Sequence, residues 1–273
     1  MIDNERKKGT LPNKELEEIL VPLTNGMQDI LSDKFLGAYL GGSFAHGGWD
    51  EYSDVDFNVV IASDLTPYER DTLKVLHARI FIIDSYWARH LEGAYFPREI
   101  LGDLTRTDEP LWYLDNGSLN FERSTHDNTL VNRWVLRERG VILAGPPPKT
   151  WIPEIPTSIL KAEVFQTMRH WGQEILEGRF VLDNGWVQAF AVLSYCRMLQ
   201  TLDKGEINSK PAGVHWAKAN LNSTWFGLID NALAERPDQY EKYYSPSDPD
   251  KVKETLAFIR YCLDFAKKHW QIE

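Results

Sequence analysis

The chain has 273 residues, of which 43% are hydrophobic and 26% charged, a composition typical of folded globular proteins that excludes intrinsic disorder. Its formal charge of −10 argues against binding of nucleic acid through phosphate neutralisation, whereas an acidic surface would attract a small cationic substrate. Two cysteines are too few for a disulfide framework or a zinc site, and no window reaches the roughly 18 apolar residues of a membrane span. We therefore expect a cytoplasmic monomer that binds neither nucleic acid nor a membrane.

Apolar residues at helical spacing predict helices in the first half of the chain, over residues 14–31, 66–77 and 128–139. The first of these contains Asn25-Gly26, where we expect an interruption. The second begins with Thr66-Pro67-Tyr68-Glu69, which has the pattern of a capping box with proline at the first helical position.

Short apolar runs, several of them rich in β-branched residues, alternate with these helices. They predict strands over residues 35–40, 55–61, 80–83, 91–96 and 141–144. A glycine-rich connection joins the first two. Alternation of helices and strands in this way predicts a mixed α/β domain.

The composition changes at Gly145-Pro146-Pro147-Pro148, and two more prolines follow by Pro156, so the chain is expected to be extended and stiff there. We place the domain boundary in this stretch, between residues 153 and 154. Beyond it no β-type run occurs. Helical patterns occupy residues 159–176, 186–202, 213–221, 225–234 and 251–268, which predicts an all-α helical bundle.

The most informative stretch lies between the first two strands. Gly41 and Gly42 allow a sharp turn and close approach of backbone amides to phosphate oxygens, and Ser43 adds a hydroxyl donor. Asp54 and Asp56 are two residues apart, so on a strand both carboxylates project to the same side, where they suit a hard cation such as Mg²⁺. A glycine turn that binds phosphate, next to a metal site, is the least that an enzyme needs to transfer a phosphate-containing group.

These residues carry a family resemblance. Gly42-Ser43, Gly47 and Ser53-Asp54-Val55-Asp56, followed by Val59-Val60-Ile61, resemble the signature of the DNA polymerase β-like nucleotidyltransferase superfamily. Residues 129–148, 193–197 and 205–210 are similar to bacterial aminoglycoside adenylyltransferases of the streptomycin and spectinomycin type, in which a helical domain follows the nucleotidyltransferase domain. The resemblance implies a Mg²⁺-dependent adenylyltransferase that uses ATP, with the metal on Asp54 and Asp56 and the nucleotide near Gly42, Ser43 and Ser53.

The superfamily also has a third carboxylate on a nearby strand, which completes the metal site or takes the proton from the acceptor hydroxyl. Two residues of this chain compete for that role. Glu92 opens the predicted strand Leu91-Glu92-Gly93-Ala94-Tyr95-Phe96 as the family's strand does, whereas Asp84 follows the apolar run 80–83. Glu92 is the preferred candidate, both as a metal ligand and as the base. The simpler alternative for Glu92 and for Asp84 is an acidic side chain that is merely solvated at the end of a strand.

Other candidate residues follow from the same resemblance. It implies that Arg197 and Lys210 contact the triphosphate, for which a guanidinium and an ammonium are suited. The alternatives are a surface salt bridge for Arg197 and a solvated loop charge for Lys210. Asp183 matches a position that contacts amino groups of the substrate, although it could simply cap the helix that follows. For His46, in the glycine loop, the two interpretations are approach to the nucleotide and a hydrogen-bonded loop histidine, and we expect the second.

Taken together, residues 1–153 are expected to form a nucleotidyltransferase domain and residues 154–273 a helical domain, with the active site in the cleft between them. The expected reaction is transfer of AMP from ATP to a hydroxyl of an aminoglycoside-type antibiotic, which would confer resistance. One alternative is a nucleotidyltransferase that modifies a protein. Another is a non-catalytic nucleotide-binding protein with the same fold. The presence of both Asp54 and Asp56 argues against this alternative, because a protein without activity need not keep the metal ligands.

Overall fold

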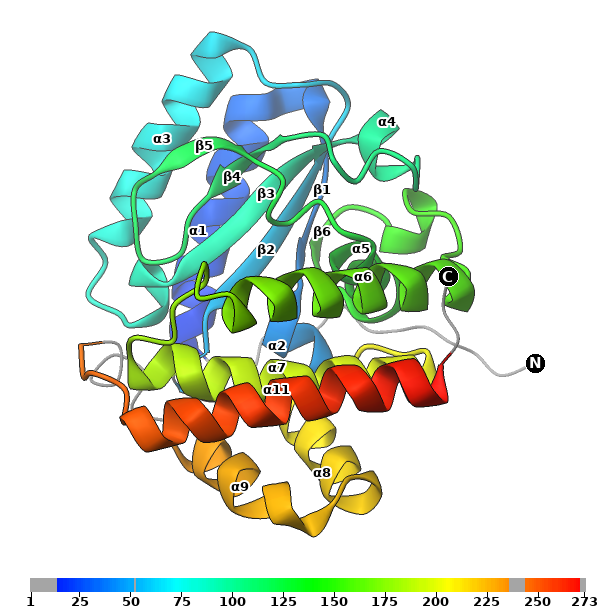
Figure 1. Cartoon of the computed structure of the whole chain (residues 1–273). Coiled ribbons are helices and arrows are strands. Elements are labelled where there is room, and N and C mark those ends of the chain that lie inside the picture. Colours follow the sequence, from blue (N-terminus) through cyan, green and yellow to red (C-terminus); the bar gives the residue numbers. More distant parts are fainter. Residues whose placement is uncertain (1–13, 52, 236–243, 271–273) are drawn as a thin grey trace. The chain divides into compact units, whose positions relative to one another are not determined.

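The computed structural model describes residues 14–51, 53–235 and 244–270, and the chain divides into two compact units (Figure 1). The first unit is Met1–Ile155 and the second is Pro156–Glu273. The division falls at 155/156, where 153/154 was expected, inside the proline-rich stretch. Since proline fixes φ near about −65° and lacks an N–H donor, this stretch continues neither the preceding sheet nor the following helix.

The first unit is built on a six-stranded sheet with the order β5-β4-β3-β2-β1-β6. β2 and β3 pair in parallel, and the other neighbouring strands pair antiparallel. The strands are β1 (Phe35–Leu40), β2 (Val55–Ile61), β3 (Leu91–Pro97), β4 (Leu111–Leu114), β5 (Phe121–Ser124) and β6 (Val141–Ala144). The predictions of β1, β2, β3 and β6 are confirmed, whereas the sequence pattern does not predict β4 and β5.

Five α-helices and three short 3₁₀ turns connect these strands in the described part of the first unit. They are α1 (Lys14–Leu31), η1 (Ser32–Lys34), α2 (Gly42–His46), α3 (Pro67–Phe81), η2 (Trp87–Arg89), α4 (Arg98–Leu101), α5 (Leu130–Arg139) and η3 (Pro148–Thr150). The predicted capping box of α3 is confirmed, because Thr66 and Glu69 each accept a hydrogen bond from the other's backbone N–H. A glycine turn alone is expected between β1 and β2, but the chain adds the short helix α2 there.

The predicted strand over residues 80–83 is wrong, because α3 continues to Phe81. Ile80 is buried on the same helical face as Leu73 and His77, while Ile82, just beyond the helix, is 78% exposed. A run of four apolar residues has no internal period that distinguishes a strand from the end of a buried helix. The helix therefore takes Ile80 into the core, and Ile82 stays outside.

The expected interruption of α1 at Asn25-Gly26 is also wrong, since α1 is continuous from Lys14 to Leu31. A Cβ atom on Gly26 would lie 2.6 Å from Cδ1 of Leu76 on α3. Gly26 thus serves the close approach of two helices rather than a break in one. The loss of about 1 kcal/mol in helix propensity that glycine carries is compatible with a helix held by tertiary packing.

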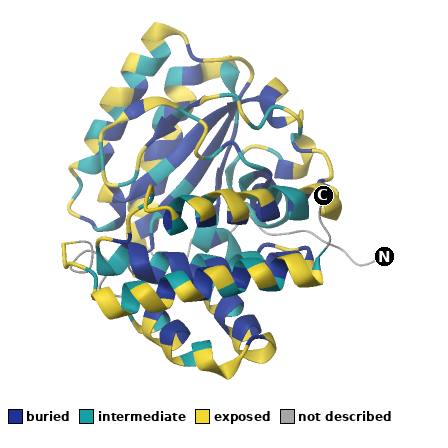
Figure 2. Cartoon of the chain, viewed as in Figure 1, coloured by how far each residue is buried: buried dark blue, intermediate teal, exposed yellow. Residues whose placement is uncertain are grey.

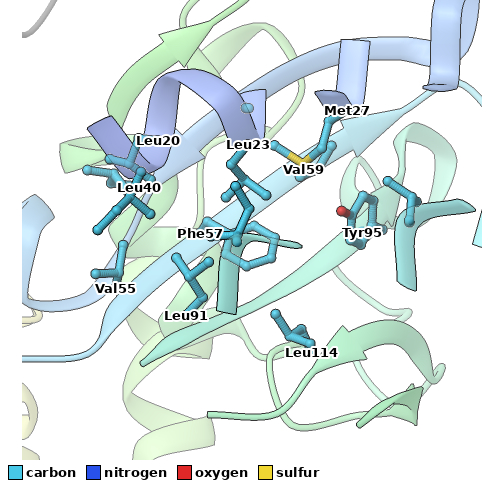
Figure 3. Close-up of a cluster of buried hydrophobic side chains, with 14 of the residues drawn as sticks. Leu20, Leu23, Met27, Leu40, Val55, Phe57, Val59, Leu91, Tyr95 and Leu114 are labelled. Carbon is cyan, nitrogen blue, oxygen red and sulfur yellow. The ribbon is translucent and has the colours of Figure 1, made fainter. Parts of the chain in front are cut away.

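The core of the first unit lies between α1 and one face of the sheet (Figure 3). Leu20, Leu23 and Met27 of α1 pack over Val55, Phe57 and Val59 of β2, all of them at most 1% exposed (Figure 3). Because successive side chains of a strand point to opposite faces, the intervening Asp56 and Asn58 project from the other face of the sheet. The alternation of β2 thus places the hydrophobic core on one face of the sheet and these polar residues on the other.

The second unit is helical, as predicted, and contains no strand in residues 156–235 and 244–270. Its elements are α6 (Thr157–Leu176), α7 (Gly185–Lys204), α8 (Lys210–Asn220), η4 (Ser223–Trp225), α9 (Phe226–Ala234) and α11 (Pro249–His269). α7 is the central helix, packs against each of the four other α-helices, and is largely buried (Figure 2).

Cys196 on α7 and Cys262 on α11 are buried and free. None of the helices in the described ranges is long and apolar enough to cross a bilayer.

Candidate active site

Asp56 and Glu92 lie side by side on the central parallel strands. They are direct partners in the β2–β3 register, so their side chains project from the same face of the sheet, on strands about 4.8 Å apart. Asp54 immediately precedes β2, whose first amide, that of Val55, donates to His90 O at 2.8 Å. The parallel register therefore places Glu92 beside the aspartate motif without any special loop.

The glycine turn is built directly against Asp56. The Gly41 N–H donates to the Asp56 carbonyl at 2.8 Å, and a Cβ atom on Gly42 would lie 1.7 Å from Oδ2 of Asp56. Gly42 also has φ of +46°, a conformation that L side chains rarely adopt. Close approach and backbone conformation both exclude a side chain here, so glycine is required at residue 42.

Ser43 and Ser53 have different surroundings. The Oγ of Ser43 is buried in α2 and has no hydrogen-bond partner within the described residues. A buried hydroxyl in this state is costly unless a ligand or water completes it. The Ser53 hydroxyl, in contrast, accepts from the Asp50 amide at 2.9 Å and donates to the Asp50 carboxylate at 3.0 Å, so it closes the loop before the aspartates.

Glu92 is held by two groups that no sequence pattern singles out. The Tyr113 hydroxyl donates a short hydrogen bond to Oε1 of Glu92, and Nε2 of His126 lies 3.3 Å from the same oxygen. The hydrogen bond with Glu92 raises the pKa of His126 to about 9, and burial together with the charge of Glu92 raises the pKa of Tyr113 well above its usual range. Only 15% of the Glu92 side chain is exposed.

Asp127 joins this group. One ligand atom from each of Glu92, His126 and Asp127 lies within 4.8 Å of the other two. Burial, and then the charge of Glu92, raise the pKa of Asp127 to about 7. Glu92 is therefore flanked by an imidazole that favours the cationic form and by a carboxyl group that resists ionisation.

The loop that carries His126 and Asp127 is tied to the strand of the aspartates. Asn132 on α5 donates from Nδ2 to Oδ1 of Asn58 at 3.0 Å and to the Asp127 carbonyl at 2.9 Å. Next in the chain, the buried Asn128 donates to the carbonyls of Arg106 and Glu109, both at 2.8 Å. These amide contacts hold the loop on the same face of the sheet as Asn58.

Asp84 and His46, two further residues considered from the sequence, contact arginines outside this group. Asp84, the alternative third carboxylate, is in the turn after α3, fully exposed, and forms a 3.0 Å ion pair with Arg89. Glu92, and not Asp84, is therefore next to Asp56. His46 is hydrogen-bonded, as expected: its Nδ1 is 3.2 Å from Nη1 of Arg139, a contact that holds the glycine loop to α5.

The candidate residues of the second unit lie on α7 and α8. A Cβ atom on Gly213 of α8 would lie 2.9 Å from the backbone N of Arg197, so the two helices are in close contact at Arg197. Lys210 is in the first turn of α8, with Nζ 5.2 Å from the centroid of the Phe190 ring. Within this unit both basic residues thus belong to the packed α7–α8 pair.

Asp183 lies just before α7 and is exposed. The cap of α7 is its neighbour Asn184, whose Oδ1 accepts from the Val187 amide at 2.8 Å. The simple alternative of helix capping by Asp183 is therefore wrong, since its carboxylate instead accepts from Nδ2 of Asn184 at 3.1 Å.

The first unit has the donor set of a Mg²⁺ site. Asp56 and Glu92 present carboxylate oxygens on one face, Asp54 adjoins them, and hard oxygen ligands are what Mg²⁺ prefers. The buried Ser43 hydroxyl follows Gly42 directly in the chain, has no hydrogen-bond partner among the described residues, and could donate to a phosphate oxygen. The residues present thus fit both a divalent cation and a nucleotide phosphate.

Comparisons with known proteins point in one direction. The family model of the aminoglycoside adenylyltransferase C-terminal domain matches residues 151–261. Spectinomycin 9-adenylyltransferases of Staphylococcus aureus strains Mu50 and N315 are 24% identical over 277 residues, covering 94% of this chain and 96% of the relative. A crystal structure of a spectinomycin adenyltransferase from Enterococcus faecialis with ATP and spectinomycin has a TM-score of 0.67 at 16% identity, covering 91% of this chain and 99% of that one.

The structural likeness supports the mixed α/β unit followed by a helical unit, the fold class expected from the sequence. The family model covers most of the second unit, which is the half with the looser sequence motifs. Over nearly its whole length the chain resembles the aminoglycoside adenylyltransferases, and its residues 151–261 match the C-terminal domain of that family.

Proposed function

We propose that the chain is a Mg²⁺-dependent adenylyltransferase that moves AMP from ATP to a hydroxyl group of an aminoglycoside-type antibiotic, with spectinomycin as the first acceptor to test. One observation carries this proposal: Asp56 lies beside Glu92 in the parallel register, with the Gly41-Gly42 turn packed on its carboxylate. A phosphate-binding turn, paired carboxylates and a candidate base on one sheet face are the parts that phosphoryl-group chemistry needs.

In this proposal Asp54, Asp56 and Glu92 hold Mg²⁺, and the turn at Gly42 and Ser43 holds the phosphates. When bound, the metal neutralises charge on the triphosphate. Glu92 accepts the proton of the acceptor hydroxyl as that oxygen forms a bond to the α-phosphorus. The bond from the α-phosphorus to the oxygen bridging to the β-phosphate breaks, and pyrophosphate leaves.

The helical unit supplies the remaining proposed contacts. Arg197 and Lys210 bind the triphosphate, a role supported by their placement on the contacting helices α7 and α8. Asp183 binds an amino group of the acceptor, a role supported by its exposed carboxylate outside the helix cap. Ser53 acts on the nucleotide site indirectly, by fixing the loop before Asp54 through its bonds to Asp50.

The expected setting is a cytoplasmic monomer that confers resistance. Cys196 and Cys262 are both buried and free, which agrees with a protein of a reducing compartment. The acidic chain, at −10, suits a cationic acceptor. Full-length similarity to enzymes named for a small antibiotic favours this acceptor class over a protein acceptor.

The direct test uses purified protein with Mg²⁺, labelled ATP and either spectinomycin or streptomycin. Pyrophosphate release that depends on the antibiotic, with label appearing on the drug, is the expected result. Asp56→Asn should abolish both. Equal release by the Asp56→Asn chain would rule out the proposed metal site, and label on a protein in place of the drug would rule out the acceptor class.

A further inference from the structure

Resting on the proposed function, we infer that Tyr113 and His126 are positioning residues that hold the Glu92 carboxylate in its reactive orientation. Both contact the same oxygen, Oε1: the Tyr113 hydroxyl donates to it, and Nε2 of His126 is 3.3 Å from it. With Oε1 engaged by two donors, Oε2 is the oxygen that faces the proposed metal and the acceptor hydroxyl. Neither residue touches the reacting atoms in this arrangement.

The sheet fixes where Tyr113 lies. On β4 it pairs with Ala94 of β3, two residues beyond Glu92, so Tyr113 and Glu92 project from the same face as diagonal neighbours. Tyr113 is only 5% exposed. A buried phenol on a strand has few alternative rotamers, so its hydroxyl is a rigid donor for the carboxylate.

His126 is more exposed, but its position is fixed by its surroundings. Its ring centroid lies 5.3 Å from that of Tyr113, so the two positioning side chains also contact each other. The next residues anchor the loop: the Asp127 carbonyl accepts from Asn132, and Asn128, 1% exposed, is bonded to two backbone carbonyls. The imidazole is therefore held over Glu92 from outside the sheet.

Orientation matters because a glutamate side chain has three rotatable bonds. Glu92 would sample several rotamers if the bonds to Oε1 were absent. Misplacement of a reacting group by about 1 Å can cost about 100-fold in rate. Loss of either donor should therefore slow the chemical step while leaving the nucleotide contacts of Gly42 and Ser43 intact.

The test compares Tyr113→Phe, His126→Ala and His126→Gln in the full chain, with Mg²⁺, ATP and spectinomycin. Tyr113→Phe and His126→Ala should lower kcat about 10- to 100-fold with KM for ATP changed less than about twofold. His126→Gln, which keeps an N–H donor, should recover most of the rate. Tyr68→Phe on α3 and His170→Ala on α6, both highly exposed, are the matched controls and should keep the rate of the unaltered chain.

A second measurement does not depend on activity. Tyr113→Phe should lower the melting temperature less in a Glu92→Gln chain than in the chain with Glu92, because the Tyr113 hydroxyl bonds more strongly to an ionised carboxylate than to the neutral amide oxygen of glutamine. An equal shift in both backgrounds, or unchanged kcat in Tyr113→Phe and His126→Ala, would overturn the inference. No transfer by the unaltered chain would instead overturn the proposed function, while the melting comparison would still show whether Tyr113 holds Glu92.

Discussion

The space for a side chain at Gly42 is already filled by the carboxylate of Asp56, whose Oδ2 would lie 1.7 Å from a Cβ atom there. The turn proposed to bind phosphate and the proposed metal ligand are thus one packed unit. A change in the turn should therefore act on the carboxylate as well as on the phosphate contacts.

Gly42→Ala should lower kcat/KM by at least about 100-fold, since the methyl group must displace Asp56 or the turn. Gly178→Ala is the matched control, because Gly178 also has positive φ, +74°, but nothing lies within 4 Å of its Cβ position. Steady-state kinetics of both variants check this. Similar losses of activity in the two would mean that backbone strain alone, without the contact to Asp56, explains the effect.

Glu92→Gln should lower kcat by about 10²- to 10⁴-fold, the range that a general base contributes, with a smaller effect on ATP binding. Asp84→Asn should leave kcat unchanged within about twofold, because Asp84 is fully exposed in a turn and forms a surface ion pair with Arg89. The measurement is single-turnover transfer from labelled ATP. If Asp84→Asn lowered the transfer rate and Glu92→Gln did not, Asp84 and not Glu92 would be the base.

Arg197→Ala and Lys210→Ala should each raise KM for ATP by about 10- to 100-fold, since a hydrogen bond to a charged group contributes about 1.5–3 kcal/mol. Lys218→Ala offers a control on the same helix as Lys210, because Lys218 is ion-paired with Asp230 at 2.8 Å. ATP affinity from calorimetry accompanies the kinetics. Unchanged affinity in both variants would leave Arg197 and Lys210 as structural residues of the α7–α8 pair.

His77 predicts a pH dependence of stability unrelated to catalysis. It is buried on α3 with Nε2 2.9 Å from the Tyr95 hydroxyl, and burial lowers its pKa to about 4. The unfolded chain, with a pKa of about 6.5, binds the proton more readily. Stability is therefore fully present above about pH 6.5 and falls as the pH is lowered toward 4.

Between pH 7.5 and pH 5 this histidine should remove about 2 kcal/mol from the free energy of unfolding. Urea titrations at the two pH values measure the loss. A His77→Gln chain should lose about that much less over the same interval, and the exposed His170→Gln chain should behave as the unaltered protein does. If the free energy of unfolding of His77→Gln fell by the same amount, groups other than His77 would cause the pH dependence.

The strands and helices with a clear hydrophobic period could be predicted from sequence. Phe35–Leu40 and Val55–Ile61 are apolar runs bounded by turn residues, and all five α-helices described in the second unit carry helical spacing. β4 and β5 are four residues long, and Phe121–Ser124 has polar residues at three of its four positions, so neither differs from a loop by composition.

Some residues of the candidate site could likewise be predicted from the sequence, and others could not. Asp54, Asp56, Gly42 and Ser43 lie within one short stretch of sequence, where spacing alone indicates their chemistry. Tyr113 and His126 reach Glu92 only because β4 pairs with β3 and because amide contacts hold the loop after β5. Contacts between residues distant in sequence have no local pattern, so no motif could have indicated these two.

The β2–β3 pair is the one parallel pair in the described sheet, and parallel strands require a crossover, here residues 62–90 with α3. Asp56 lies before this crossover and Glu92 after it. The exposed turn at Ile82 and Asp84 therefore offers a place to divide the polypeptide into two fragments, each with half of the carboxylate pair. Fused to two interacting proteins, such fragments would make a complementation reporter in which the proposed transferase activity registers the association of the fusion partners.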